Sequence, residues 1–294
     1  MFLTTLCSPI RSSRAVDRAR SSIVHDASRH SFSRPLAVRS RARNAGGSVK
    51  HILAPPQSDL LRRMLSARAL VAFDFDGTLA PIVTEREAAR MRQTTAQLFR
   101  HVCERYVCAV ISGRAHDDVA ARLGGARVKH VIGNHGSEPH EQAAAFAAEV
   151  GQALACLDSA LRPCRGVDIE DKRYSLAIHY RAAPDRQQAR AQIQAAVASC
   201  APRLRQVPGK LVLNLIPARA PDKGQALQRL LAIEQAEMAL YVGDDVTDED
   251  VFRLDEPRRI ITVRIGETKA SAAQFYLRTQ LELDVLLSAL VAAP

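Results

Sequence analysis

The chain has 294 residues and a mass of 32.1 kDa, and 47% of its residues are hydrophobic, which suits one large globular domain or two smaller ones. Its net charge is +10, but ten of the 41 basic and only two of the 31 acidic residues lie within residues 1–50. The rest of the chain therefore carries only +2. This distribution argues against nucleic acid as a partner of the folded part.

Residues 1–56 form a basic segment rich in Arg, Ser and Ala, a composition that predicts a disordered tail. Three interpretations are open: an organelle transit peptide, an arm that binds nucleic acid or a partner, and a non-native extension from an early start, which we favour. No apolar run reaches the roughly 18 residues of a membrane helix. We therefore expect a soluble monomer in the cytoplasm without a membrane partner, and leave organelle targeting by the tail open.

The six cysteines contain no C-x-x-C pair and have no histidine at zinc spacing. They are Cys7, Cys103, Cys108, Cys156, Cys164 and Cys200. This pattern predicts reduced thiols in the core or on the surface.

A helix is expected from Ser58, after Pro55 and Pro56. Short apolar runs then alternate with stretches of helical length, and they predict strands at 69–73, 106–111, 128–132, 238–242 and 259–265, with helices at 87–105 and 115–123. Continuous apolar strands separated by helices are typical of parallel βαβ units. The fold class is therefore α/β, with a Rossmann-like parallel sheet as its core.

The segment 139–216 has a different pattern. It predicts an Ala-rich helix at 141–161, a second helix at 184–200 and two antiparallel hairpins, with strands at 166–170, 174–181, 203–207 and 210–216. We expect an inserted α+β cap domain here, and a core domain formed by 57–138 and 217–294.

Carboxylates gather where two of the predicted parallel strands end. Asp74 and Asp76 follow one strand, and Asp244, Asp245 and Asp248 follow another. Ligands of open α/β sheets bind at the carboxyl ends of the strands, and carboxylate oxygens suit Mg²⁺. An EF-hand calcium loop is excluded, because the second cluster lacks the required Gly and Glu spacing. Asp245 and Asp248 could instead cap the following helix.

Anion-binding groups share the same edge. Ser112 and Gly113 end a strand, and Lys223 opens a predicted helix. A hydroxyl, free backbone N–H groups and one lysine form a credible phosphate site. An aspartate could then attack the phosphorus, while Asp76 protonates the leaving alcohol. Arg114 could contact substrate or lie in solvent, and His135 is interpreted as a hinge or packing residue.

Four segments, in chain order, resemble the motifs of the haloacid-dehalogenase superfamily of phosphotransferases: DFDGTLAPI, SGR, DKGQAL and GDDVTDED. Further segments resemble the trehalose-6-phosphate phosphatase family over most of 68–280: GNHGSE, EDKRYSLAIHYR, VPGKLVLNLIP and YVGDDVTDEDVF. The resemblance implies Asp74 as nucleophile and Asp76 as general acid and base. It implies Mg²⁺ bound by Asp74, the Asp76 carbonyl and Asp244, and phosphate bound by Ser112 and Lys223.

In the cap, the resemblance implies that Glu170, Lys172, Arg181 and Lys210 contact the trehalose hydroxyls. Asn214 departs from the pattern, because the family usually has Glu there. Asn keeps hydrogen-bonding capacity but brings no charge. This position leaves the strength of disaccharide binding and the identity of the sugar open.

The expected function is Mg²⁺-dependent hydrolysis of trehalose 6-phosphate through an aspartyl-phosphate, in trehalose biosynthesis. The alternatives are a capped phosphatase acting on another sugar phosphate, such as a sucrose or mannosyl phosphate, and a catalytically silent sugar-phosphate sensor. The intact pair of Asp74 and Asp76 argues against the sensor.

Overall fold

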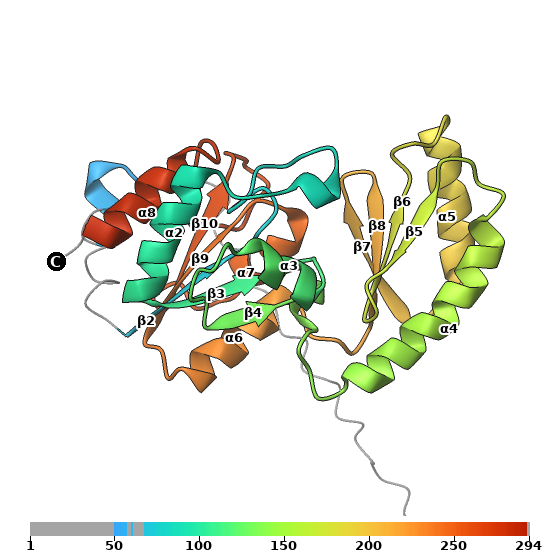
Figure 1. Ribbon diagram of the computed structural model, residues 1–294, viewed down its shortest axis with the longest axis horizontal. Coiled ribbons are helices and arrows are strands. Elements are labelled where there is room, and N and C mark those ends of the chain that lie inside the picture. Colours follow the sequence, from blue (N-terminus) through green and yellow to red (C-terminus); the bar gives the residue numbers. More distant parts are fainter. Residues whose placement is uncertain (1–49, 58–59, 61–67, 293–294) are drawn as a thin grey trace, which may run out of the picture. The chain divides into compact units, whose positions relative to one another are not determined.

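The computed structural model describes residues 50–57, 60 and 68–292. Its larger sheet has seven strands in the order β1-β11-β10-β9-β2-β3-β4, and every neighbouring pair is parallel (Figure 1). The strands are β1 (Lys50–His51), β2 (Ala69–Phe73), β3 (Val107–Ile111), β4 (His130–Ile132), β9 (Met238–Gly243), β10 (Ile260–Ile265) and β11 (Phe275–Leu277). The predicted α/β fold with a parallel sheet is confirmed.

Side chains of the central strands alternate between two apolar layers. In β2, Val71 and Phe73 face one layer while Leu70 and Ala72 face the other, and all four are fully buried. Helices α2 (Gln93–Arg105), α3 (His116–Arg122) and α8 (Glu282–Ala292) contribute to the first layer. Helices α6 (Lys223–Ile233) and α7 (Glu249–Phe252) contribute to the second. Because the central strands are covered on both faces, their ends are the part of the sheet that a ligand can reach.

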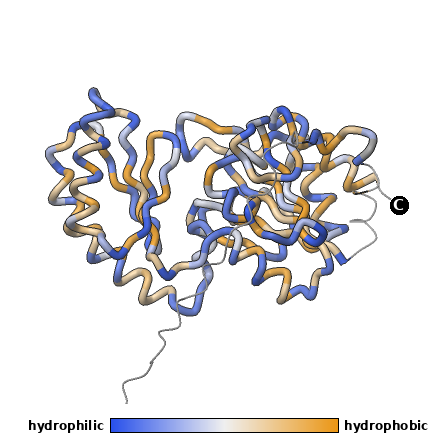
Figure 2. The backbone as a smooth tube through the Cα atoms, turned by 180° about the vertical axis from the view of Figure 1, so that it is seen from behind, coloured by the Kyte–Doolittle hydropathy of each residue, from blue (hydrophilic) through white to orange (hydrophobic). Residues whose placement is uncertain are grey.

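A second sheet of four antiparallel strands has the order β5-β6-β8-β7. Its elements are β5 (Asp168–Asp171), β6 (Leu176–His179), β7 (Leu204–Gly209) and β8 (Val212–Pro217), with α4 (Ala143–Leu161) and α5 (Arg186–Cys200). Both helices pack on one face of this sheet, and apolar stretches recur along the strands of both sheets (Figures 1 and 2). Apart from Pro217 at the end of β8, the sheet falls within the segment 139–216 expected to form the cap, whose boundaries stay a prediction.

The prediction of a disordered tail over residues 1–56 is wrong for its last residues, from Lys50 onward. Residues Lys50–His51 form β1, which pairs with β11, and Ile52 is fully buried in the core. The short helix η1 (Pro55–Gln57) follows. A strand of two residues has no periodicity to detect, so composition alone extended the tail too far. Residues 1–49 and nearly all of the helix expected from Ser58 lie outside the described residues.

The helix expected over 87–105 begins only at Gln93. Before it, η2 (Arg86–Ala88) is a single turn, and the chain then runs extended. The carbonyls of Glu87 and Ala89 accept hydrogen bonds from the Arg122 guanidinium, at 2.9 and 3.0 Å. A tertiary partner thus replaces helical bonding in this stretch.

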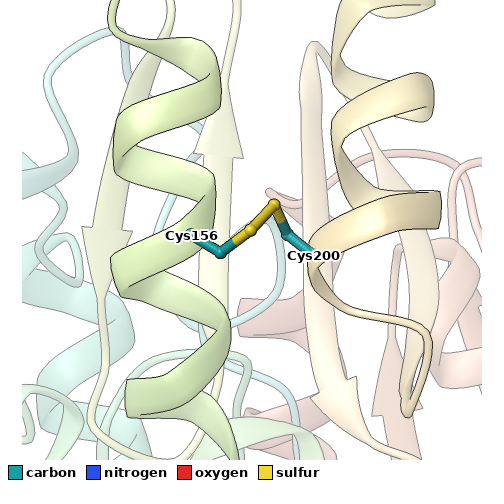
Figure 3. The surroundings of a disulfide bond; sticks show 2 residues. All are labelled: Cys156 and Cys200. Atoms are coloured by element: carbon teal, nitrogen blue, oxygen red, sulfur yellow. A yellow bond between two sulfur atoms is a disulfide. The ribbon is translucent and has the colours of Figure 1, made fainter.

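The prediction of reduced cysteines is wrong for one pair. Cys156 on α4 and Cys200 at the end of α5 form a disulfide, with 5.4 Å between their Cα atoms (Figure 3). Among the other described cysteines, Cys103, Cys108 and Cys164 are free thiols. The bonded pair is 44 residues apart in sequence, and only the packing of α4 beside α5 brings it together.

Among the described helices, α4 alone is long and apolar enough, by length and composition, to cross a membrane. Glu149 and Asp158 interrupt its apolar residues, so α4 meets this criterion by mean composition and not as one continuous apolar run. Its buried side chains recur every three or four residues and pack against the second sheet and its surroundings: Phe146, Val150, Ala153, Leu157 and Leu161. This amphipathic packing is typical of a core helix.

Candidate active site

Asp74 lies directly after β2, at the carboxyl edge of the larger sheet. Its backbone N–H donates to the carbonyl of Val242 at 2.9 Å, so the neighbouring strand β9 fixes its position. Asp74 is only 4% exposed, whereas the side chain of Asp76 is 41% exposed. The first carboxylate is therefore held in the floor of the site and the second is accessible from the cleft.

The turn after these residues requires glycine. Gly77 has a φ of +82°, and a Cβ there would lie 2.1 Å from Oδ2 of Asp244. The backbone of this turn thus approaches Asp244, which follows β9. The Thr78 hydroxyl donates to Oδ1 of Asp244 at 3.5 Å. The close packing brings the two predicted acidic clusters together.

Lys223 is the first residue of α6, and the helix is capped by Asp222, whose side chain accepts from the Gln225 N–H at 2.8 Å. The Lys223 side chain is 2% exposed. Its Nζ donates to Oδ1 of Asp74 at 2.8 Å and to Oδ1 of Asp248 at 2.7 Å. One buried ammonium therefore bridges two buried carboxylates.

Asp248, in the short helix η4 (Val246–Asp248), fixes the loop that carries the second acidic cluster. Besides Lys223, it accepts hydrogen bonds from the Tyr241 hydroxyl at 2.7 Å and from the N–H groups of Asp244 and Asp245 at 2.8 Å. It does not line the cleft. These four bonds are those of a structural carboxylate. Asp245, expected as a ligand, is exposed at the rim of the cleft.

The carboxylates of Asp74, Asp244 and Asp248 each place an oxygen within 4.8 Å of the others. Burial raises the pKa of Asp74 well above its usual range, Lys223 lowers it, and the charges of Asp248 and Asp244 raise it again. Burial, Asp248 and Asp245 raise the pKa of Asp244 to about 7. The three carboxylates together carry more negative charge than the single ammonium of Lys223 can neutralise. A cation therefore fits this set of hard oxygen donors.

Ser112 and Gly113 follow β3. The Ser112 hydroxyl accepts from the Arg114 N–H at 3.2 Å, and the residue is fully buried and does not line the cleft. Gly113 does line it. The structure therefore places Gly113, but not the Ser112 side chain, where a ligand has direct access.

Arg114 is 6% exposed and contacts Asp76 with two nitrogens, Nε at 2.7 Å and Nη2 at 2.8 Å. Its Nη1 donates to Asp118 at 2.7 Å. The interpretation of Arg114 as a solvated residue is excluded by its burial. It lines the cleft as the residue that orients the Asp76 carboxylate.

Two predicted cap residues already contact the core. Glu170 on β5 forms ion pairs with Arg86 and with His179, and Nζ of Lys172 donates to the Gly113 carbonyl at 3.0 Å. Burial would raise the pKa of Glu170, but the bond from His179 and the charges of Lys172 and Arg86 lower it below its usual range. The carboxylate is therefore ionised at neutral pH.

Arg181 and Lys210 are exposed, and Asn214 on β8 is 8% exposed. All three line the same cavity, which has a volume of about 430 Å³. Core residues of the cavity include Asp74, Asp76, Gly113, Arg114, Lys223, Asp244 and Asp245. Apart from Ser112 and Asp248, every site residue expected from the sequence faces this space.

Residues 72–280 match the family model described as trehalose-phosphatase. The chain belongs to the trehalose-phosphatase family. Its relatives include the trehalose-phosphate phosphatase of Mycobacterium tuberculosis, 36% identical over 234 residues, which covers 73% of this chain and 59% of the relative. A M. tuberculosis protein named as an uncharacterized glycosyl hydrolase is 38% identical over 213 residues, covering 66% of this chain and 16% of that protein. The chain thus spans less than two thirds of the curated relatives it matches.

Solved structures support the same fold. The C-terminal domain of Candida albicans trehalose-6-phosphate phosphatase aligns with a TM-score of 0.69 and 23% identity, over 80% of this chain and 96% of that one. Trehalose-6-phosphate phosphatase of Aspergillus fumigatus aligns with a TM-score of 0.57 and 24% identity, over 81% and 97%. At these identities the likeness concerns the fold alone.

Sequence reasoning missed three residues of this member of the trehalose-phosphatase family. Arg86 pairs with Glu170, Tyr241 donates to Asp248, and His135 lines the cavity although it was interpreted as packing. Arg86 lies in a polar stretch without periodicity. Tyr241 could have been found, because it lies three residues before Asp244 in a buried strand, where a tyrosine hydroxyl needs a partner.

Proposed function

We propose that the protein is a Mg²⁺-dependent phosphatase that hydrolyses trehalose 6-phosphate to trehalose and phosphate, as a step of trehalose biosynthesis. The observation that carries this proposal is the cluster of buried Asp74, buried Lys223 and half-buried Asp244 in one cavity, whose lining also includes Glu170, Lys172 and other cap residues. Membership of the trehalose-phosphatase family supports the substrate.

Asp74, Asp244 and the backbone carbonyl of Asp76 would hold the Mg²⁺ ion. The surplus negative charge of this cluster and the hard character of its oxygen donors fit that ion. When bound, Mg²⁺ would offset the charge of the carboxylates and of the substrate phosphate.

In the proposed reaction, an oxygen of Asp74 attacks the phosphorus, the bond from phosphorus to the sugar oxygen breaks, and Asp76 gives its proton to that oxygen. Water then attacks the phosphorus, the bond between phosphorus and the Asp74 oxygen breaks, and Asp76 takes a proton from the water, so phosphate leaves and the Asp74 carboxylate is restored. Lys223 lies 2.8 Å from the attacking carboxylate, so it reduces the repulsion between Asp74 and the phosphate. Gly113 is proposed to contact the phosphate, whereas the buried Ser112 hydroxyl, expected from the sequence as a second phosphate ligand, is proposed to fix this loop through the bond that it accepts from the Arg114 N–H.

Arg114 donates two hydrogen bonds to the Asp76 carboxylate, which must also reach the leaving oxygen of the substrate. We propose that the pair orients Asp76 before substrate arrives and that Asp76 turns toward the leaving oxygen in the complex. In the cap, Glu170, Lys172, Arg181, Lys210 and Asn214 are proposed to contact the sugar.

Replacing Asp74 by Asn tests the chemistry. Asn presents a neutral amide in place of the nucleophilic carboxylate, so the D74N variant should release no phosphate from trehalose 6-phosphate while its far-ultraviolet circular dichroism is unchanged. Asp158→Asn, at an exposed position on α4, is the matched control and should keep full activity. Turnover by a folded D74N protein would refute the nucleophile.

We propose the cytoplasm as the location and a monomer as the functional form. The alternative is an organelle or another more oxidising compartment, and the Cys156–Cys200 disulfide favours this alternative because structural disulfides are rare in the cytosol. The N-terminal sequence and the thiol content of the protein isolated from its own cells would decide between these locations.

A further inference from the structure

His135 occupies a tightly fixed position in η3 (Asn134–Gly136), directly after β4. Its φ is 59°, in the left-handed region that residues other than glycine rarely adopt. The His135 N–H donates to the Ser112 carbonyl at 2.9 Å, and the Asn134 N–H donates to the Arg114 carbonyl at 2.7 Å. The loop that follows β3 therefore determines where the imidazole lies.

His135 is 8% exposed as a residue, and both of its ring nitrogens are buried without a hydrogen-bond partner in the described part of the chain. A buried polar group without a partner costs free energy. Burial lowers the pKa of His135 well below its usual range, and the charges of Lys172, Lys223 and Arg205 lower it further. The ring is thus neutral, with one nitrogen as donor and the other as acceptor.

The imidazole lies on the backbone of the segment proposed to bind phosphate. A Cβ at Gly113 would be 2.5 Å from Cε1 of His135, so the ring occupies the space that this glycine leaves open. The carbonyl of the same glycine accepts from Lys172 of the cap segment. His135 therefore lies at the border between the predicted phosphate site and the sheet that faces it.

Asn214 approaches His135 from β8. Its neighbours Leu213 and Leu215 point into the apolar core under α4 and α5, so Asn214 points to the opposite face. Its amide nitrogen makes one long bond, 3.4 Å, to the Val207 carbonyl. A side-chain bond with Asn214 raises the pKa of the His135 imidazole, but its geometry is poor, since neither ring nitrogen has a well-formed hydrogen bond in the described part of the chain. Both side chains retain unused hydrogen-bonding capacity.

We propose that His135 and Asn214 together bind one hydroxyl of the sugar, His135 from the core and Asn214 from the cap. A hydroxyl both donates and accepts, as do a neutral imidazole and an amide, so one hydroxyl inserted between them satisfies both. The inference rests on the proposed function, because it requires a sugar phosphate as substrate. It assigns His135 a role in positioning the sugar, and no role in proton transfer.

The test compares two substrates of the Mg²⁺-loaded enzyme, trehalose 6-phosphate and p-nitrophenyl phosphate, which has no sugar hydroxyl. His135→Asn is the first variant, because Asn tolerates a positive φ and is too short to reach the ring's position. We expect kcat/KM for trehalose 6-phosphate to fall about fivefold to tenfold more than kcat/KM for p-nitrophenyl phosphate, mainly through KM. His135→Gln, whose longer amide can reach the hydroxyl, should recover part of the loss.

Asn214→Ala, together with the variant that combines it with His135→Asn, completes a double-mutant cycle. If both side chains bind the same hydroxyl, the loss in the double variant is smaller than the product of the two single losses. His101→Asn, at an exposed position on α2, is the matched control. Equal losses on both substrates, or independent losses in the cycle, would overturn the proposal. A failure of the proposed function would look different, since the unaltered protein would then turn over no trehalose 6-phosphate.

Discussion

The Asp248 side chain, beneath the site, accepts four hydrogen bonds. Oδ1 accepts from Lys223 and Tyr241, while Oδ2 accepts from two backbone N–H groups. An asparagine amide can accept on one side only, so its NH₂ group would face donors whichever way it turned. The full set of bonds therefore requires a carboxylate at this position.

Asp248→Asn should lower the free energy of unfolding by about 3 kcal/mol, because it leaves Lys223 with one fewer charged partner in a buried place. Urea denaturation followed by circular dichroism measures the change. Asp245→Asn is the matched control, and its exposed side chain predicts almost no effect. Equal midpoints for the two variants would mean that Asp248 is not the structural carboxylate described here.

Asp244 should make the proposed binding of Mg²⁺ depend on pH. Its pKa of about 7 means that the carboxylate is increasingly protonated below that pH, and Mg²⁺ binds the deprotonated form. The apparent affinity for Mg²⁺ should therefore fall as the pH is lowered through 7, by at most about tenfold per unit. Isothermal titration calorimetry at pH 6, 7 and 8 measures this. An affinity that is equal at all three values would contradict the raised pKa.

At the residue scale, the sequence indicated which residues line the candidate site better than it indicated their contacts. Asp74, Lys223 and Asp244 could be found because each directly follows a predicted strand or opens a predicted helix. The pairing of Arg114 with Asp76 and the unpartnered nitrogens of His135 depend on loop geometry, which no local pattern encodes. For this reason both residues were assigned less specific roles from the sequence.

At the scale of elements, the disulfide between α4 and α5 is one feature that the sequence did not predict. The bond closes a separation of 44 residues and joins two helices that pack on the same sheet. Restricting the unfolded chain by a loop of this size stabilises the folded state by about 4 kcal/mol in the chain-entropy model.

Cys156→Ser should accordingly lower the free energy of unfolding by about 2–4 kcal/mol, and dithiothreitol should have a similar effect on the unaltered protein. Urea denaturation with and without reductant is the measurement. Cys164→Ser, which removes a free thiol, is the control and should respond to reductant as the unaltered protein does. A midpoint that reductant does not change would show that the bond contributes nothing.

The central strands were predictable because their apolar runs are continuous, and β2 was located without error. Elements at the margins were not predictable to the same degree. β1 has two residues, and the stretch before α2 has its carbonyls satisfied by Arg122. In both cases contacts between distant segments decide the structure, and a local pattern carries no information about them.

At the scale of the whole molecule, the two sheets have different roles in the proposed function. The parallel sheet carries the groups for phosphate chemistry at its carboxyl edge, and the uncovered face of the antiparallel sheet supplies the residues that would contact the sugar. The motif order predicts the reaction from the sequence. The sugar depends on side chains such as Asn214, whose partners become visible only when both sheets are in place.

The most direct test of the central claim is phosphate release from trehalose 6-phosphate, sucrose 6-phosphate and mannosyl phosphates, with Mg²⁺ and with the metal removed by EDTA. We predict that trehalose 6-phosphate has the highest kcat/KM and that EDTA abolishes turnover, with recovery on addition of Mg²⁺. Comparable or faster turnover of the sucrose or mannosyl phosphates, or full activity in EDTA, would contradict the account.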